Sequence, residues 1–272
     1  MTLVKKFLLR GLGASLLLYV LLAAALVVNQ RSFIYLPFPG AITPEDARLE
    51  NYARHQTTTA DGTPIIYWES TGNESAPTLL YFHGNAGGLH MFTGPLDYLN
   101  KHDFHVIAIE YRGYPDAPSG ASQTAIVSDG VALYDFVKKT RPHHPIVMWG
   151  WSLGSGIATQ VAAKRNPTAL VLEAPFTGVV DRAGEMFPML PVNYLMRDTY
   201  LSRVAIKDVH SPLFIMHGED DITIPVHHGK ALFAAANEPK ILRTYPHFGH
   251  ENLMDSPGFP EAVAFLKSRA KP

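Results

Sequence analysis

Apolar and polar positions alternate in a regular way along most of the chain. Seven short runs are rich in β-branched and aromatic residues, and the middle five are almost continuously apolar, which is typical of strands buried on both faces of a sheet. The stretches between the runs have the length of crossover helices, so the pattern predicts an α/β fold with a mostly parallel central sheet flanked by helices. The predicted strands lie at residues 63–70, 78–84, 105–113, 146–152, 169–175, 212–220 and 241–246. The predicted helices lie at residues 89–101, 119–140, 153–165, 226–236 and 258–269.

One stretch, at about residues 176–210, breaks this alternation. It places methionines, leucines and Phe187 among prolines. Flexible apolar side chains in a long connection between two strands are typical of a short lid over a site, and ordinary packing is the alternative. We call residues 176–210 the lid segment.

The amino-terminal segment contains an uncharged run at residues 11–28. As a helix this run is about 27 Å long, roughly the thickness of the hydrocarbon core of a bilayer. Three basic residues precede it and only Arg31 closely follows it, so the positive-inside rule predicts a cytoplasmic N-terminus and a large domain on the exported side. A cleaved signal peptide, which would give a secreted protein, is an alternative because residues 23–25 are alanines. A buried helix of a soluble protein is a third.

Two features favour a membrane anchor over a cleaved segment. The apolar run continues past the alanines to Val28, and residues 32–39 supply aromatic side chains suited to a membrane interface. The predicted organisation is a cytoplasmic N-terminus at 1–10, a transmembrane anchor at 11–28, a linker at 29–49 and an enzyme domain at 50–272.

The charge balance and the composition exclude several classes of protein. The 272 residues include 23 Lys and Arg against 24 Asp and Glu, a formal charge of −1. This gives no basic excess for binding nucleic acid, so no nucleic-acid partner is expected. The chain has no cysteine, which excludes disulfides, a thiolate nucleophile and cysteine-based zinc sites.

The pattern G-x-S-x-G occurs at residues 150–154, directly after the apolar run IVMW and directly before SGIATQVAAK. This context predicts a strand, a sharp turn and a helix, with small residues that allow the strand and helix to approach and with Ser152 exposed at the turn. Ser152 is therefore the candidate nucleophile. A glycine-rich turn with a capping serine is the alternative.

A serine nucleophile needs a base, and His250 is the candidate. It lies in HFGHENL, after the last predicted strand and before the last predicted helix, where a loop can place an imidazole at the carboxyl edge of the sheet. The neighbouring His247 is expected to be structural. A metal site built on this pair is disfavoured because the chain has no HExxH pattern or evident third ligand.

The acid that orients the base is expected in HGEDDITIP, after the predicted strand at 212–220. Glu219, Asp220 and Asp221 are all candidates, and periodicity does not choose among them. Glu173, at the end of another predicted strand, ranks behind Asp221 because a structural role explains it equally well.

The oxyanion of an acyl-transfer reaction needs two donors. The backbone N–H of Leu153 follows the nucleophile, and the glycine-rich loop HGNAGG at 83–88 offers Asn85 as the second. The same loop could hold a phosphate, but it lacks the Lys-Ser/Thr ending and the G-x-G-x-x-G spacing of nucleotide sites. No cofactor and no metal ion are expected.

The motifs HGNAGG, EYRGY, GWSLGSG, HGEDDITIP and FGHENL, in this order, resemble the alpha/beta-hydrolase superfamily over residues 50–270. The chain is most similar to single-anchor serine hydrolases related to serine-aminopeptidase-like proteins and to membrane-bound acyl-protein thioesterases. The family pattern HG-x-x-D-x-x-V/I-P, matched from His217 to Pro225, implies that Asp221 is the acid. The family loop YRGYG-x-S is not conserved here, because Pro115 follows Tyr114.

The resemblance and the candidate residues together predict a serine hydrolase that cleaves an ester or thioester by acyl transfer. Ser152 is expected to attack, His250 to move the proton and Asp221 to orient His250. The apolar lid segment and the anchor favour a lipid-like, acylated or small hydrophobic substrate. The alternatives are a serine peptidase of the aminopeptidase kind and a catalytically silent, hydrolase-like binding protein.

Overall fold

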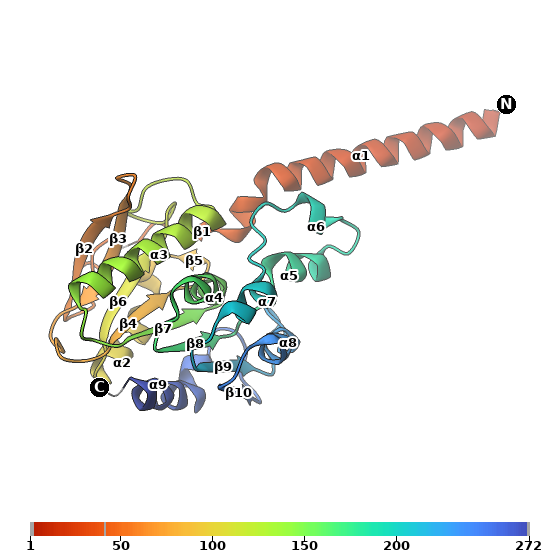
Figure 1. Ribbon diagram of the computed structural model, residues 1–272. Coiled ribbons are helices and arrows are strands. Elements are labelled where there is room, and N and C mark those ends of the chain that lie inside the picture. Colours follow the sequence, from red (N-terminus) through yellow and green to blue (C-terminus); the bar gives the residue numbers. More distant parts are fainter. Residues whose placement is uncertain (1–2, 41, 271–272) are drawn as a thin grey trace.

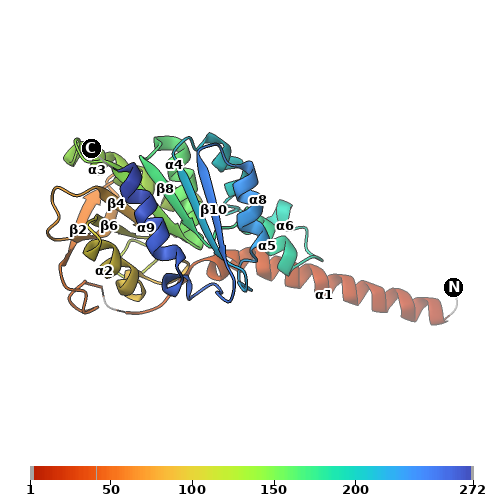
Figure 2. The same ribbon diagram turned by 90° about the horizontal axis from the view of Figure 1, so that it is seen from below.

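A computed structural model describes residues 3–40 and 42–270 (Figure 1). Residues 1–2 of the predicted cytoplasmic segment and residues 271–272 of the predicted enzyme domain lie outside the described residues. The described residues form a sheet that is covered by helices on both faces, and a long helix projects from this domain (Figure 2).

Within the described part of the chain, eight strands form one sheet in the order β10-β9-β8-β7-β4-β6-β3-β2. Neighbouring strands are parallel except around β3, which pairs antiparallel with both β2 and β6. The predicted mostly parallel sheet is therefore confirmed. The strands are β2 (Tyr52–Thr58), β3 (Pro64–Ser70), β4 (Thr78–Phe82), β6 (His105–Glu110), β7 (Ile146–Trp151), β8 (Ala169–Glu173), β9 (Leu213–Gly218) and β10 (Lys240–Tyr245).

Two hydrophobic cores lie on the two faces of the sheet. Side chains alternate between them along each strand, so that Leu80 of β4 packs in one core and Leu79 in the other. Helices α3, α4 and α8 cover the first face, whereas α2 and α9 cover the second (Figure 2). These helices are α2 (Thr93–Lys101), α3 (Gln123–Thr140), α4 (Leu153–Arg165), α8 (His227–Ala235) and α9 (Gly258–Arg269).

The seven predicted strands correspond to β3, β4 and β6–β10, and the strand that the sequence does not reveal is β2. Its sequence, YARHQTT, has few apolar residues, and most of its positions are exposed or half-buried at the edge of the sheet. An edge strand with little buried surface lacks the apolar run on which such a prediction depends. A small separate sheet of β1 (Leu36–Pro37) and β5 (Ala86–Gly87) is too short to be predicted at all.

The lid segment lies between β8 and β9 and contains three short α-helices. These are α5 (Val179–Met186), α6 (Val192–Leu195) and α7 (Ser202–Ala205). Helices α5 and α6 lie beside the projecting helix α1 rather than over the middle of the sheet (Figure 1).

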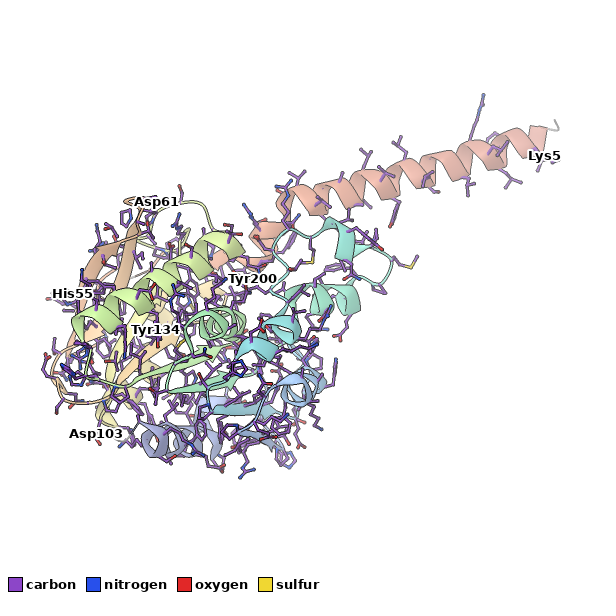
Figure 3. The ribbon with its side chains drawn as sticks, in the orientation of Figure 1. Lys5, His55, Asp61, Asp103, Tyr134 and Tyr200 are labelled. Carbon is purple, nitrogen blue, oxygen red and sulfur yellow. The ribbon has the colours of Figure 1, made fainter. Side chains whose placement is uncertain are left out.

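Helix α1 runs without a break from Leu3 to Ile34. It thus extends beyond the predicted run at 11–28 in both directions, and its residues Phe7–Ile34, with a mean hydropathy of 2.4, are long and apolar enough to cross a membrane. Figure 3 places Lys5 near the far end of α1.

The last turns of α1 are fixed to the domain. Arg31 Nε lies 2.8 Å from Asp198 Oδ2 in the lid segment, and Tyr35 is buried with its hydroxyl 3.0 Å from that of Tyr200. Strand β1 begins at Leu36, so Tyr35 alone separates it from α1. The predicted linker at 29–49 therefore starts inside a helix.

Candidate active site

Ser152 lies at the turn between β7 and α4, at the carboxyl edge of the sheet. Its backbone has φ 52° and ψ −119°, a strained conformation for a residue with a side chain and the one that exposes a nucleophile at such a turn. Helix α4 approaches the sheet so closely that a Cβ atom on Gly150 of β7 would collide with the backbone of Gly154, and one on Gly154 with the backbone of Phe82 in β4. Packing therefore requires both glycines of the G-x-S-x-G pattern.

Three side chains from three loops at this edge form one hydrogen-bonded chain. Ser152 Oγ lies 2.9 Å from His250 Nε2, and His250 Nδ1 lies 2.7 Å from Asp221 Oδ2. The three residues follow β7, β10 and β9 respectively, and all three are buried. The structure thus brings together the three residues that the sequence predicts as nucleophile, base and acid.

Asp221 is held in place by its own loop. Its Oδ1 accepts the backbone N–H groups of Thr223 at 2.9 Å and Ile224 at 2.7 Å. Burial favours the neutral acid, but contacts with His217 and His250 outweigh it and hold the pKa of Asp221 well below its usual range. Asp221 is therefore ionised at neutral pH.

The ionised carboxylate determines the tautomer of His250. Because Asp221 Oδ2 accepts a hydrogen bond, the imidazole has its proton on Nδ1, and the unprotonated Nε2 faces the hydroxyl of Ser152. This arrangement can take a proton from the serine as it attacks an electrophilic carbon.

The other acidic and histidine candidates lie elsewhere. Asp220 and Glu219 are exposed, and Glu219 accepts a hydrogen bond from the hydroxyl of Thr244 at 2.7 Å. His247 is also exposed, in a left-handed turn with φ 68°. Asp221 is therefore the acidic residue of this loop that faces His250.

Glu173 is a buried carboxyl group at the end of β8, close to the serine turn. Its Oε2 accepts a hydrogen bond from the indole N–H of Trp149 at 2.8 Å, and its backbone oxygen accepts the N–H of Ser152 at 3.0 Å. Burial raises the pKa of Glu173 to about 7. The carboxyl group of Glu173 is bonded to Trp149, whereas His250 Nδ1 is bonded to Asp221, so the role of Glu173 is structural.

The raised pKa of Glu173 predicts a pH-dependent loss of stability. In the unfolded chain the carboxyl group ionises near its ordinary pKa, whereas in the folded protein it stays protonated until about pH 7. The free energy of unfolding therefore falls as the pH rises between those two values, and it is constant above them. The loss amounts to roughly 3 kcal/mol. Glu173→Gln keeps an acceptor for Trp149, and we expect its Tm relative to the wild type in detergent to rise between pH 5 and pH 8. Parallel Tm profiles would contradict this assignment.

Asn85 and Leu153 border the same cavity as Ser152. Leu153 is the first residue of α4, where the geometry of a helix leaves the backbone N–H without an intrahelical acceptor. Asn85 lies in the loop between β4 and β5, and its backbone oxygen accepts hydrogen bonds from Leu36 N at 2.9 Å and the hydroxyl of Tyr114 at 2.6 Å. Both predicted oxyanion donors therefore belong to residues that line the cavity together with Ser152.

The EYRGY motif supports the loop that contains Asn85. Tyr111 donates a hydrogen bond to the backbone oxygen of His83 at 2.8 Å, and its ring stacks on the imidazole at 3.9 Å. Glu110 Oε1 lies 3.2 Å from His83 Nε2, and Glu110 Oε2 accepts the backbone N–H of Leu89. The sequence identifies this motif only through the resemblance, because nothing in its spacing indicates that it braces another loop.

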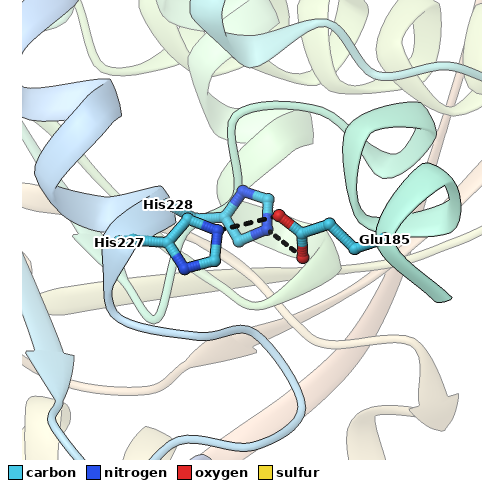
Figure 4. Close-up of side chains that lie close together, drawn as sticks. All are labelled: Glu185, His227 and His228. Atoms are coloured by element: carbon cyan, nitrogen blue, oxygen red, sulfur yellow. Dashed lines mark hydrogen bonds and ion pairs between the residues drawn. The ribbon is translucent and has the colours of Figure 1, made fainter.

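One cluster of side chains has the composition of a metal site. Glu185 of α5 lies 2.8 Å from His227 Nε2 and 3.2 Å from His228 Nε2, both on α8 (Figure 4). The backbone N–H of Thr177 donates to His228 Nδ1, so Nε2 keeps its proton and donates it to Glu185. A metal ligand needs an unprotonated nitrogen, so hydrogen bonding accounts for the cluster as a link between the lid segment and α8.

A cavity of about 360 Å³ lies over Ser152, between the lid segment and α1. The sequence does not predict that α1 contributes to it. The available signal is Gln30, a polar residue at the end of the apolar run, which is buried and hydrogen-bonded to the lid segment.

Comparisons with known proteins agree with this architecture. The family model for the alpha/beta hydrolase fold matches residues 77–191. An uncharacterized protein of Mycobacterium tuberculosis is 31% identical over 86% of this chain and 86% of its own length. The lysophosphatidylserine lipase ABHD12 of Xenopus tropicalis is 31% identical over 68% of this chain, which spans about half (53%) of that relative.

Solved structures show the same fold at low sequence identity. An esterase of Pyrococcus furiosus superposes with a TM-score of 0.69 at 20% identity, over 88% of this chain and 98% of the esterase. A bacterial membrane phospholipase A superposes with a TM-score of 0.59 at 17% identity, over 99% of both chains. The second match covers nearly the whole of this chain, including the region of α1.

Proposed function

The chain belongs to the alpha/beta-hydrolase superfamily, and on that premise we propose that it is a serine hydrolase that cleaves an ester or thioester bond by acyl transfer. The observation that supports this most directly is the unbroken chain of hydrogen bonds from Ser152 Oγ through His250 to Asp221. A silent binding protein would have no need to keep all three groups aligned.

The reaction proceeds in two halves. Ser152 Oγ attacks the acyl carbon while its proton passes to His250 Nε2, and Asp221 stabilises the imidazolium that forms. The backbone N–H groups of Leu153 and Asn85 stabilise the oxyanion. His250 then protonates the leaving alcohol or thiol. In the second half, His250 takes a proton from the water that attacks the acyl carbon, and it returns this proton to Ser152 Oγ as the acid is released. No step requires a metal ion or a cofactor.

The substrate we propose is lipid-like, acylated or otherwise hydrophobic. The cavity over Ser152 is lined mainly by aliphatic and methionine side chains of α1 and the lid segment, an environment that favours an acyl chain over a polar peptide. Relatives named lysophosphatidylserine lipase make a lipid ester the first class to test.

We propose further that α1 spans a membrane once, with the N-terminus in the cytoplasm and the enzyme domain on the exported side. Three basic residues precede its apolar part, and the one basic residue that closely follows, Arg31, is paired with Asp198. A reporter enzyme fused to the C-terminus is expected to be active outside the cytoplasm and to stay with membranes after a high-salt wash. A shortened, soluble product would instead indicate cleavage of the segment.

The function is tested by a series of acyl esters and thioesters of increasing chain length, assayed with the full chain in detergent beside Ser152→Ala. We expect turnover that depends on Ser152 and increases with chain length until the cavity is filled. If the wild type hydrolyses no member of the series, an aminopeptidase-like activity or a silent binding protein becomes the better explanation, and p-nitroanilide peptides distinguish these two.

A further inference from the structure

Helix α1 forms one wall of the cavity over Ser152. Six of the residues that line this cavity belong to it, at positions 23, 26, 27, 30, 33 and 34. This spacing marks one face of a helix. The same face is the less exposed one, since Ala23, Leu26 and Val27 are half-buried and Gln30 is buried while Ala24 and Ala25 are exposed. One face of α1 therefore forms part of the candidate active site, although its hydropathy alone suggests only a membrane anchor.

The lid segment follows α1 for several turns. Tyr19 donates a hydrogen bond to the backbone oxygen of Met189 at 2.8 Å. Farther along, Gln30 Oε1 accepts the N–H of Arg197 at 2.7 Å, and Gln30 Nε2 lies 3.3 Å from the backbone oxygen of Leu195. At the rise of an α-helix, the contact from Tyr19 to Gln30 extends for about 16 Å along α1. Helices α5 and α6 lie beside α1 (Figure 1).

The charges on α1 indicate where a bilayer would lie. Arg10 and Arg31 enclose 20 consecutive uncharged residues, 11–30, which is the number that spans a hydrocarbon core of about 30 Å. Tyr19 is then near the middle of the bilayer, and the contact from Tyr19 to Gln30 falls within the leaflet next to the enzyme domain. The part of the lid segment that touches α1 must therefore lie at the same depth.

The surface of this part of the lid segment suits such a position. Residues 186–196, which we call the lid tip, have no charged side chain, whereas Glu185 and Arg197 flank them. Met189 and Tyr194 of the lid tip are 82% and 91% exposed. Large exposed apolar side chains beside a spanning helix are typical of a surface in contact with lipid. The hydroxyl of Tyr19 also supplies a partner for a backbone carbonyl that would have no water in hydrocarbon.

We propose that the lid tip is immersed in the leaflet next to the enzyme domain and that the substrate is a membrane lipid, one acyl chain of which enters the cavity sideways between α1 and the lid segment. This inference rests on the proposed function and on the membrane-spanning role of α1. The cavity extends along α1 from Ile34 to Ala23, and its volume of about 360 Å³ is at the small end of the range for ligand pockets. It therefore accommodates one chain, with the ester at Ser152, and the lipid need not leave the bilayer.

The depth of the lid tip can be measured directly, because the chain contains no cysteine. Met189→Cys and Tyr194→Cys in the full chain, labelled with a small fluorophore and reconstituted into phosphatidylcholine nanodiscs, are expected to lose fluorescence to nitroxides on lipid acyl chains and to be protected from iodide in the buffer. The control is Lys101→Cys on α2, on the opposite side of the domain (Figure 1). Quenching by iodide at the lid-tip positions equal to that of the control would overturn the proposal. This measurement does not depend on any enzymatic activity.

The role of α1 in binding the acyl chain is tested by a matched pair of substitutions. Ala23→Trp places an indole in the cavity, whereas Ala24→Trp places it on the exposed face one residue away. We expect Ala23→Trp to lower the rate on a hexadecanoyl lysophospholipid in nanodiscs by about tenfold or more, with little effect on a water-soluble acetyl ester, and Ala24→Trp to change neither rate. If Ala23→Trp leaves both rates unchanged, the acyl chain does not bind along α1. If the wild type hydrolyses neither substrate, the proposed function fails, and the quenching experiment still decides the position of the lid tip.

Discussion

Replacement of Ser152 or of His250 by alanine is expected to lower the rate of ester hydrolysis by roughly 10⁶-fold, because each removes one member of a group that acts as a unit. Ser152 Oγ lies 2.9 Å from His250 Nε2. The serine needs the histidine to accept its proton, and the histidine has no proton to accept without the serine. The double variant should be scarcely slower than either single variant. The measurement is kcat for a medium-chain ester with the full chain in detergent.

A control for this first prediction is Ser155→Ala, in the same turn. The Ser155 hydroxyl donates a hydrogen bond to the backbone oxygen of Ser152 at 2.6 Å and is buried, so its loss is expected to affect stability far more than the chemical step. Losses that add up in the double variant of Ser152 and His250 would show that the two residues act independently and would contradict the assigned roles.

The second large effect is expected for Asp221→Asn, which should lower kcat by roughly 10⁴-fold. The backbone N–H groups of Thr223 and Ile224 both point at Oδ1, so the asparagine must keep its carbonyl oxygen there and turn its NH₂ group toward His250. That NH₂ group can only donate, which moves the imidazole proton to Nε2 and leaves no acceptor for the proton of Ser152. The folded structure should otherwise be retained.

The matched control for Asp221→Asn is Asp220→Asn. Asp220 is exposed and adjacent in the chain, so both substitutions remove one negative charge from the same loop. We expect Asp220→Asn to leave kcat within a few-fold of the wild type, which is measured with the same ester. Were Asp220→Asn the more damaging of the two, the acid would have to be reassigned to Asp220.

The sheet was predictable because its central strands are buried on both faces. Strand β8, for example, is apolar from Ala169 to Leu172, and a short apolar run of this length next to a helical stretch is typical of a strand buried on both faces. Strand β2 was not predictable, since an exposed edge strand gains its place from backbone pairing with β3, and backbone groups are the same in every residue. The position of β2 is therefore less visible in the sequence than that of the central strands.

The site was predictable only in part, for a similar reason. The G-x-S-x-G pattern identifies Ser152 because the turn imposes steric demands that few residues meet. The choice among Glu219, Asp220 and Asp221 depends on which side chain turns inward, and that follows from two backbone N–H groups of a loop rather than from any periodicity. Only the resemblance to a family favoured Asp221 at the level of sequence.

The contribution of α1 to the cavity escaped prediction for a physical reason. Alanine, leucine and valine suit contact with lipid and contact with an apolar cavity equally well, so hydropathy does not distinguish the face at Ala23 and Val27 from the face at Ala24 and Val28. The polar Gln30 departs from the pattern, and besides Val27 of its own helix its partners, Leu195 and Arg197, lie more than 160 residues away.

The short junction at Tyr35 has a consequence for how such an enzyme would encounter its substrate. One residue separates α1 from β1, and Arg31 is paired to Asp198, so the helix has little freedom to swing relative to the enzyme domain. On the proposed spanning role of α1, the tilt of the helix in the bilayer would set the orientation of Ser152. A domain on a long tether would sweep over the membrane surface and meet solutes from the surrounding water. On the proposed membrane placement, this domain would instead meet mainly molecules that diffuse in the plane of the membrane past its own helix, so its rate on a lipid substrate should follow the mole fraction of that lipid in the bilayer rather than its bulk concentration.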